Sequence, residues 1–239
     1  MDESSSLKKA NQLMAAFHAG RPSIGAWQML PGSNVSRVLA RSGVDWVLVD
    51  LEHGNIGGAL DCGAHGVLIP LLRTTDEARQ VVQSAKFPPK GRRGYGNPFT
   101  FERFDPKGTS IQYLQEANDA ILTMVQIETK EAFESIDEIA GVDGVDVLFI
   151  GPFDLGNNLG HPILNGDMSP ELKAAIGKIL AATKKAGKKC GILATSGEQG
   201  RLYAEQGFDM ISVTIDYSTL ETCTEREVRV AKGIRASRP

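Results

Sequence analysis

Residues 120–154 read AILTMVQIETKEAFESIDEIAGVDGVDVLFIGPFD and contain one full repeat of the expected fold. Residues 120–128 and 146–154 are largely apolar runs with the length of buried strands, and residues 129–140 between them form an amphipathic stretch. Strands that are apolar on both faces and are separated by helices are typical of parallel α/β layers. This stretch therefore predicts a strand–helix–strand unit with parallel strands.

The same alternation continues in both directions along the chain. The other expected strands cover residues 22–29, 45–52, 65–72, 188–195 and 210–216. The expected helices cover residues 7–19, 33–42, 74–86, 111–117, 129–140, 169–186, 197–206 and 218–234. Seven strands and eight helices predict an α/β fold, a (β/α)8 TIM-type barrel that lacks one piece, formed by residues 1–239 as a single domain.

The missing piece lies where two strands follow each other too closely. Only 12 residues, HGNIGGALDCGA at positions 53–64, separate the second and third expected strands. A parallel crossover with its helix needs at least about 10–12 residues, and four of these residues are glycines, so we expect no helix here. One βα unit is therefore missing between residues 54 and 60, or it belongs to a segment that the sequence omits. We expect residues 56–59 to form either a chain break or a distorted barrel seam with exposed strand edges.

The overall composition excludes several classes of function. The 26 Lys and Arg are outnumbered by 29 Asp and Glu, and a net charge of −3 provides no basic surplus for binding nucleic acid. No apolar run approaches the roughly 18 residues of a membrane helix, and the polar first nine residues do not resemble a signal peptide. The cysteines, Cys62, Cys190 and Cys223, form no CxxC pair and no even-numbered framework. We therefore expect a cytoplasmic protein without a membrane or nucleic-acid partner.

Two carboxylates end neighbouring strands and are candidates for a metal site. In a parallel barrel the functional groups lie at the carboxyl ends of the strands, where Glu128 and Asp154 are expected. A carboxylate pair with few other fixed ligands suits Mg²⁺ or Mn²⁺, with Co²⁺ as another candidate, whereas zinc would call for a His/Cys cluster. The alternative is structural: Asp154 could cap a helix, and Glu128 could be a solvated acid beside a helix start.

His53 and Asp61 flank the short junction. His53 follows a strand end and could act as a general base near neutral pH, although a lone histidine is more often a satisfied hydrogen-bonding residue. Asp61 precedes a strand, a position that by the barrel rule indicates a structural role.

Several motifs, taken together and in order, resemble the HpcH/HpaI aldolases, the metal-dependent class II pyruvate aldolases, with the citrate lyase β-subunit as a more distant relative. They are AGRPSIGAW, DWVLVDLEHG, ALDCGAHGVLIP, FPPKGRRGYG, YLQEAND, VQIET, GVDVLFIGPFDL and GILATSGEQ, and they extend over nearly the whole chain. The resemblance implies a modified (β/α)8 barrel, a homohexamer, and the cleavage or formation of a carbon–carbon bond through a pyruvate enolate.

The resemblance also implies roles for individual residues. Glu128 and Asp154 match the metal-binding carboxylates, and the segment Gly151, Phe153 and Asp154 matches the part that binds pyruvate through backbone N–H groups. Pro152 has no N–H, so the donors begin after it. His53 matches the acid/base histidine, and Asp61 matches the aspartate associated with it, in place of the structural role above. The C-terminal helix, residues 218–234, matches a helix at subunit contacts.

One departure from the family lies at the short junction. Family members carry a further helix, strand and arginine between the histidine and the ALDCG aspartate, and residues 54–60 cannot supply them. That arginine would hold the pyruvate carbonyl and stabilise the enolate. The sequence therefore predicts an aldolase that acts on a 4-hydroxy-2-oxo acid, such as 4-hydroxy-2-oxoheptanedioate or a 2-keto-3-deoxy sugar acid, to give pyruvate and an aldehyde. The alternatives are a CoA-thioester lyase of the same superfamily and a catalytically impaired barrel.

Overall fold

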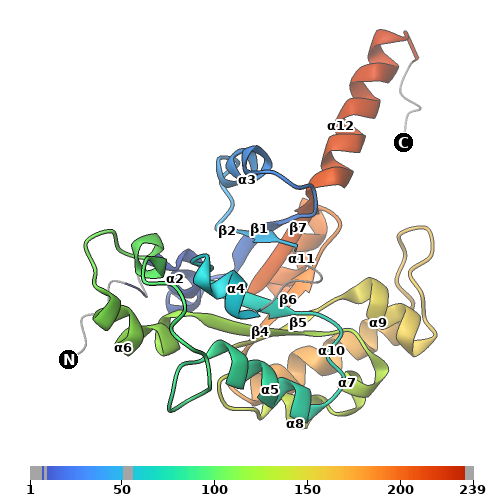
Figure 1. Ribbon diagram of the computed structural model, residues 1–239. Coiled ribbons are helices and arrows are strands. Elements are labelled where there is room, and N and C mark those ends of the chain that lie inside the picture. Colours follow the sequence, from blue (N-terminus) through green and yellow to red (C-terminus); the bar gives the residue numbers. More distant parts are fainter. Residues whose placement is uncertain (1–6, 8–9, 51–55, 235–239) are drawn as a thin grey trace.

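Seven parallel strands form one sheet in the computed structural model, which describes residue 7, residues 10–50 and residues 56–234 (Figure 1). The strands are β1 (Ser23–Gln28), β2 (Trp46–Val49), β3 (Gly66–Ile69), β4 (Leu122–Ile127), β5 (Val147–Ile150), β6 (Lys189–Leu193) and β7 (Met210–Ile215). Their order in the sheet is β2-β1-β7-β6-β5-β4-β3. Each lies within one of the seven predicted strands, so the strand prediction is confirmed.

The helices agree with most of the predicted ones. They are α2 (Gln12–His18), α3 (Ser33–Ala40), α4 (Ile56–Asp61), α5 (Thr75–Ala85), the short 3-10 helix η1 (Thr100–Arg103), α6 (Ser110–Ala120), α7 (Lys130–Glu134), α8 (Ile136–Ala140), α9 (Pro152–Leu159), α10 (Pro170–Lys185), α11 (Gly197–Gln206) and α12 (Asp216–Ala231). The predicted strand over residues 146–154 is too long, because Pro152 begins α9, and proline favours the first position of a helix.

The junction before β3 contains a helix, so the prediction that none fits there is wrong. In α4, Leu60 is completely buried, and Ile56 packs against the same cluster. Burial of these side chains outweighs the low helix propensity of the two glycines between them. The predicted chain break over residues 56–59 is also wrong: the helix is continuous there, and Cys62 N donates to Gly58 O at 3.0 Å.

The sheet ends at β2 on one side and at β3 on the other. Among the described residues no strand joins these two ends, in agreement with the predicted seam with exposed edges. The sheet is nevertheless strongly curved, because Trp46 of β2 and Leu68 of β3 pack against the same buried cluster. The architecture is consistent with a TIM-like barrel, but it is not a complete eight-stranded one.

Side chains of the strands alternate between an inner and an outer core. On β4, Leu122 and Met124 face the inner cluster, whereas Val125 and Ile127 face the outer one. The outer cluster packs the sheet against α5, α7, α8, α10 and α11. Helix α2 closes the amino-terminal end of the interior, where the Asn11 side chain donates to the carbonyl of His65, directly before β3, and to that of Ala120, two residues before β4. Helix α2 does not cover the carboxyl ends of the strands, where a parallel barrel places its functional residues.

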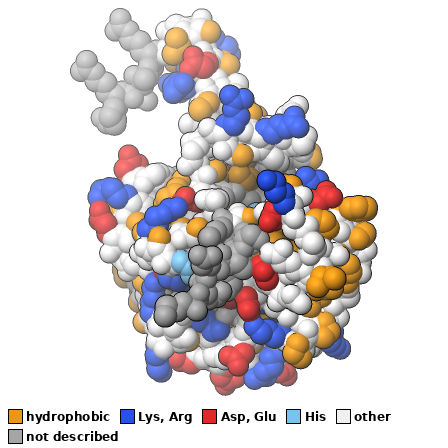
Figure 2. All heavy atoms as spheres, turned by 90° about the vertical axis from the view of Figure 1, so that its left-hand side faces the viewer, with side chains coloured by type: hydrophobic (Ala, Val, Ile, Leu, Met, Phe, Trp, Pro, Cys, Tyr) orange, Lys and Arg blue, Asp and Glu red, His pale blue; other side chains and the backbone are white. Residues whose placement is uncertain are grey.

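Two helices contribute almost nothing to this core. Helix α12 projects from the body of the molecule, and among its residues only Asp216 is buried (Figure 1). Helix α3 has no buried residue. On the face shown in Figure 2, acidic and basic side chains are interspersed. No helix in the described part of the chain has the length and apolar composition needed to cross a lipid bilayer.

Candidate active site

A small cavity lies at the carboxyl ends of the strands. Its volume is about 160 Å³. The residues around it come from six strands, from the positions directly after them and from the start of α9: Trp27, Met29, Asp50, Gln126, Phe149, Gly151, Phe153, Asp154, Leu193 and Ile215. This is the end of a parallel barrel at which catalytic residues are placed.

Glu128 is buried immediately behind this cavity. It follows β4 and is only 2% exposed. One carboxylate oxygen accepts a hydrogen bond from Leu71 N at 2.7 Å, and the other accepts one from the Gln126 side chain. Leu71 has φ of +55°, a conformation that a leucine rarely adopts. Because the Glu128 carboxylate is buried and accepts two hydrogen bonds from the protein, the interpretation of Glu128 as a solvated acid is wrong.

Asp154 is the third residue of α9 and lines the cavity. Its interpretation as a helix cap is wrong, because Gly151 occupies the N-cap position. The pKa of Glu128 is raised, first by burial and then by the negative charge of Asp154. The two carboxylates are therefore close enough to repel each other, which is the situation that a bound cation relieves.

Gly151 allows the start of α9 to lie against this carboxylate pair. A Cβ atom at position 151 would lie less than 3 Å from a Glu128 carboxylate oxygen and from the Gln126 amide nitrogen. The first intrahelical bond runs from Leu155 N to Gly151 O at 2.9 Å. The N–H groups of Phe153 and Asp154 come before the first N–H that bonds within the helix, and such groups can donate hydrogen bonds to an anion.

The donor set fits a hard divalent cation. Two carboxylates supply oxygen ligands, and the described residues contain no group of three or more His, Cys, Asp or Glu that could hold a metal. Carboxylate oxygens suit a hard cation of the Mg²⁺ type, which keeps several waters.

Comparison with known proteins identifies the family to which the chain belongs. Residues 54–222 match the HpcH/HpaI aldolase/citrate lyase family. The chain belongs to this family. A hydroxypyruvate/pyruvate aldolase of Sagittula stellata is 37% identical over 244 aligned positions, covering 89% of this chain and 94% of the relative. A 4-hydroxy-2-oxo-heptane-1,7-dioate aldolase of Shigella sonnei is 33% identical, covering 90% and 92%. The crystal structure of an HpcH/HpaI aldolase from Desulfitobacterium hafniense has a TM-score of 0.82 at 28% identity, covering 94% and 98%.

The lengths of these matches agree with the short junction. The match to the Sagittula relative has 244 positions but takes in only 89% of this 239-residue chain, about 213 residues. About thirty positions of that HpcH/HpaI relative therefore have no counterpart in this chain. The family match begins at residue 54, within the junction. These observations are in line with the shortfall of one βα unit.

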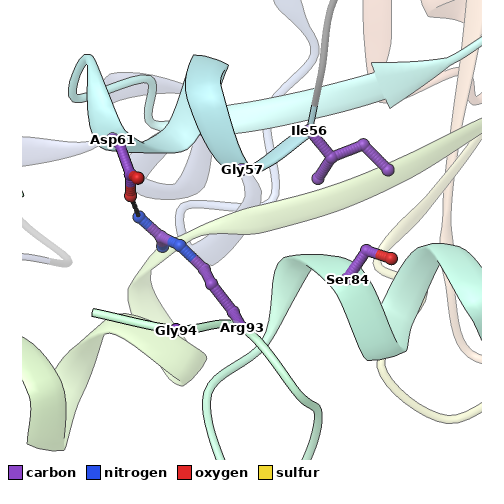
Figure 3. A pocket seen from close by; sticks show the side chains of 6 residues that line it. All are labelled: Ile56, Gly57, Asp61, Ser84, Arg93 and Gly94. Atoms are coloured by element: carbon purple, nitrogen blue, oxygen red, sulfur yellow. Dashed lines mark hydrogen bonds and ion pairs between the residues drawn. The ribbon is translucent and has the colours of Figure 1, made fainter. Parts of the chain in front are cut away.

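Of the two other residues matched to the family, only Asp61 belongs to the described part of the chain. His53 lies outside the described residues. Asp61 ends α4 and lines a second cavity, of about 430 Å³, with Ile56, Gly57, Ser84, Arg93 and Gly94 (Figure 3). An Asp61 oxygen accepts a hydrogen bond from the Arg93 guanidinium at 2.8 Å. Asp154 thus lines the strand-end cavity, where Glu128 lies against Gly151 and Gln126, whereas Asp61 lines the second cavity.

Seven residues that line the strand-end cavity were not predicted as site residues, and three of these carry polar side chains: Trp27, Asp50 and Gln126. Trp27 Nε1 donates to Asp50 Oδ2 at 2.9 Å, and Gln126 donates to Glu128. The strand-end rule already marks Asp50, because it follows β2 directly. The last strand-end acid, Asp216, instead has a structural role, since its carboxylate accepts hydrogen bonds from Met29 N and Leu30 N.

Proposed function

We propose that this member of the HpcH/HpaI family is a divalent-metal-dependent aldolase. It cleaves or forms the carbon–carbon bond of a 4-hydroxy-2-oxo acid and so interconverts that acid with pyruvate and an aldehyde. The names of the Sagittula and Shigella relatives support this reaction class. The observation that carries the proposal is the buried Glu128 carboxylate, which lies against Gly151 and Gln126 in the wall of the cavity that Asp154 also lines.

The chain's own residues bind and orient the 2-oxo acid. Glu128 and Asp154 would hold Mg²⁺ or Mn²⁺, with Co²⁺ as a further candidate. When bound, such an ion supplies a Lewis acid that polarises the 2-oxo group. The N–H groups of Phe153 and Asp154, reached past Gly151, donate to the substrate carboxylate. Gln126 fixes the carboxylate of Glu128 from the side.

Cleavage requires a base for the hydroxyl group at C4. The C3–C4 bond breaks as that hydroxyl loses its proton, and the electron pair remains on C3, which then takes up a proton to become the methyl group of pyruvate. His53 is proposed as this base, with Asp61 as the aspartate associated with it. The family arginine has no counterpart within residues 54–60, and loss of one such donor costs about 10²–10³-fold in rate. We therefore propose a slow aldolase.

The remaining features follow from the same proposal. A CoA-thioester lyase is disfavoured, because a cavity of about 160 Å³ is small for such a substrate.

We propose a single domain over residues 1–239 that assembles into a homohexamer, with α12 at the subunit contacts. The exposed apolar side chains of α12, Leu220 and Val230 among them, support this proposal. The free cysteines Cys62, Cys190 and Cys223 agree with the cytoplasm as its location.

The test is deuterium exchange into the methyl group of pyruvate, followed by NMR in D₂O with Mg²⁺ or Mn²⁺. Exchange should stop when EDTA removes the ion. Glu128→Gln and Asp154→Asn should each reduce it by about 10²-fold or more, because each removes a metal-binding charge. Glu131→Gln, at an exposed position in the first turn of α7, is the matched control and should leave exchange unchanged. Metal-independent exchange, or full exchange by Glu128→Gln, would overturn the proposal.

A further inference from the structure

The loop after β3 contacts the proposed metal site through its backbone. Leu71 has φ of +55°, and its backbone N donates to one oxygen of the Glu128 carboxylate at 2.7 Å. We infer that Leu71 is a positioning residue: its N–H, aimed by the left-handed conformation, fixes the Glu128 carboxylate in the orientation that binds the divalent ion. This inference rests on the proposed function and adds the loop after β3 to the site.

The left-handed conformation of Leu71 has no local explanation. Residues other than glycine rarely adopt positive φ, because their Cβ atom comes too close to the backbone. The Leu71 side chain is 52% exposed, so its burial gives little in return. Asn165 is the other non-glycine residue with positive φ in the described part of the chain, and asparagine tolerates this conformation in a turn such as the exposed one in which it lies.

Neighbouring contacts hold the loop in this conformation. The Thr129 hydroxyl donates to Leu72 O at 2.6 Å, and the Leu72 side chain is buried in the outer cluster. Next along the chain, Arg73 N donates at 2.7 Å to the side chain of Glu77, which belongs to the capping box of α5. A strained residue persists only where the structure around it fixes its conformation. These contacts supply that constraint for Leu71.

The N–H of Leu71 completes the support of the Glu128 carboxylate. The other oxygen of this carboxylate accepts a hydrogen bond from Gln126 and lies beside Gly151. Pro70 has no N–H, so Leu71 carries the first N–H after β3. With both oxygens held, the carboxylate has one orientation, and each oxygen retains a lone pair for a cation. Outer contacts of this kind account for about 10–100-fold in metal affinity.

The test compares substitutions of Leu71 that differ in how readily the new residue adopts positive φ. Leu71→Ile keeps the size of the side chain, but a β-branched residue strongly disfavours this conformation and turns the N–H away from Glu128. Isothermal titration with Mn²⁺ should then show an affinity about tenfold or more weaker than that of wild type. Leu71→Gly and Leu71→Asn permit positive φ and should bind Mn²⁺ within about twofold of wild type.

An ester bond at the same position removes the donor itself. Incorporation of the α-hydroxy analogue of leucine at position 71 replaces the N–H by an oxygen and keeps the side chain. This variant decides the question even if Leu71→Ile folds poorly, and its Mn²⁺ affinity should fall by about tenfold or more. Partial unfolding alone would lower the number of ions bound per chain and leave the dissociation constant of the folded fraction unchanged.

Asn165→Ile is the matched control. It creates the same backbone conflict, at φ of +54°, in an exposed turn away from the described lining of the cavity. Its Mn²⁺ affinity should equal that of wild type. Unchanged affinity in the ester variant or in Leu71→Ile, or a loss in Leu71→Gly as large as that in Leu71→Ile, would overturn the inference.

Measurements on the wild-type protein separate failure of the inference from failure of the proposed function. If the wild type neither binds Mn²⁺ nor exchanges the methyl hydrogens of pyruvate, the proposed metal-dependent aldolase fails, and the inference falls with it. If the wild type does both and the ester variant does them equally well, the proposed function stands and the inference about Leu71 alone is overturned.

Discussion

The β4–β5 side of the sheet and its β2–β3 ends differ in how completely they are buried. Every residue of β4 and β5 is buried, whereas no residue of β2 is buried and one residue of β3 is. Glu128 and Asp154 follow the first pair of strands, while His53 and Asp61 belong to the chain between the second pair. The proposed metal-binding half of the site therefore rests on a rigid core, and the proposed acid–base half rests on the open seam.

The largest effect should come from filling the space beside the carboxylate pair. Gly151→Ala would place a Cβ atom against Glu128 and Gln126 and displace the start of α9. We expect loss of metal affinity and of pyruvate exchange by about 10²-fold or more, since a small misplacement of catalytic groups can cost that much. Isothermal titration with Mn²⁺ and the exchange assay measure the two losses.

Gly177→Ala is the matched control for this substitution. Gly177 lies inside α10, and an added Cβ there meets nothing within 4 Å. That variant should bind Mn²⁺ normally and be more stable by about 0.5–1 kcal/mol, because alanine favours a helix interior. Normal Mn²⁺ binding by Gly151→Ala would show that the carboxylate pair does not depend on this glycine.

A second prediction concerns Arg93, which forms an ion pair with Asp61 in the open seam between β2 and β3. Its guanidinium pairs with Asp61 (Figure 3). The side chain is 3% exposed and lies over the Phe87 ring at 4.5 Å. Removal of one partner from a buried ion pair costs about 3–5 kcal/mol, and Asp61 is partly exposed, so Arg93→Met should cost about 2–3 kcal/mol. Urea unfolding followed by circular dichroism measures the loss.

Arg21 provides the comparison for Arg93. It forms two hydrogen bonds with Asp45, at 3.1 and 2.9 Å, but about half of its side chain is exposed. Arg21→Met should therefore cost much less stability than Arg93→Met, because solvent screens an exposed ion pair. Equal losses in the two variants would mean that burial does not set the strength of the Arg93 pair.

The difference between the two halves also explains what the sequence could and could not predict. The buried strands were recognised because runs such as VLFI at residues 147–150 are apolar on both faces. Glu128 and Asp154 followed from the strand-end rule, which needs only local pattern. Helix α4 was missed because its stability comes from Leu60 in a cluster with Tyr113 and Ala117, about fifty residues away in sequence.

The place of Asp50 in the cavity wall could not be predicted from the sequence, for a related reason. Its contact with Trp27 depends on the register of β1 against β2, in which Gln28 pairs with Val49 and Asp50 follows. A single sequence gives no access to that register, because it results from packing across the sheet. Local sequence patterns thus suffice to nominate Glu128 and Asp154, whereas the position of Asp50 depends on contacts between residues far apart in the sequence.

The smallest predicted effect is a pH dependence of stability at the seam, caused by His65. This residue directly precedes β3, stacks on Phe104 with ring centroids 4.3 Å apart, and contacts Arg103 O through Nε2. Burial lowers its pKa below the ordinary value of 6.5, and the contact with Arg103 opposes that shift only in part. The folded state therefore favours the neutral ring, while the unfolded chain takes up a proton more readily.

The sign of the effect follows from this difference in proton binding. The contribution of His65 to the free energy of unfolding is complete above pH 6.5, and it is lost as the pH falls from 6.5 through the lowered pKa of the folded state. Asparagine at this position does not titrate, so the stability difference between wild type and His65→Asn should shrink as the pH falls from about 7.5 to about 5. Urea unfolding of both proteins across that range measures it, and groups common to both, such as Glu128, cancel in the difference. A stability difference that stays constant over this range would show that the seam does not hold His65 in its neutral form.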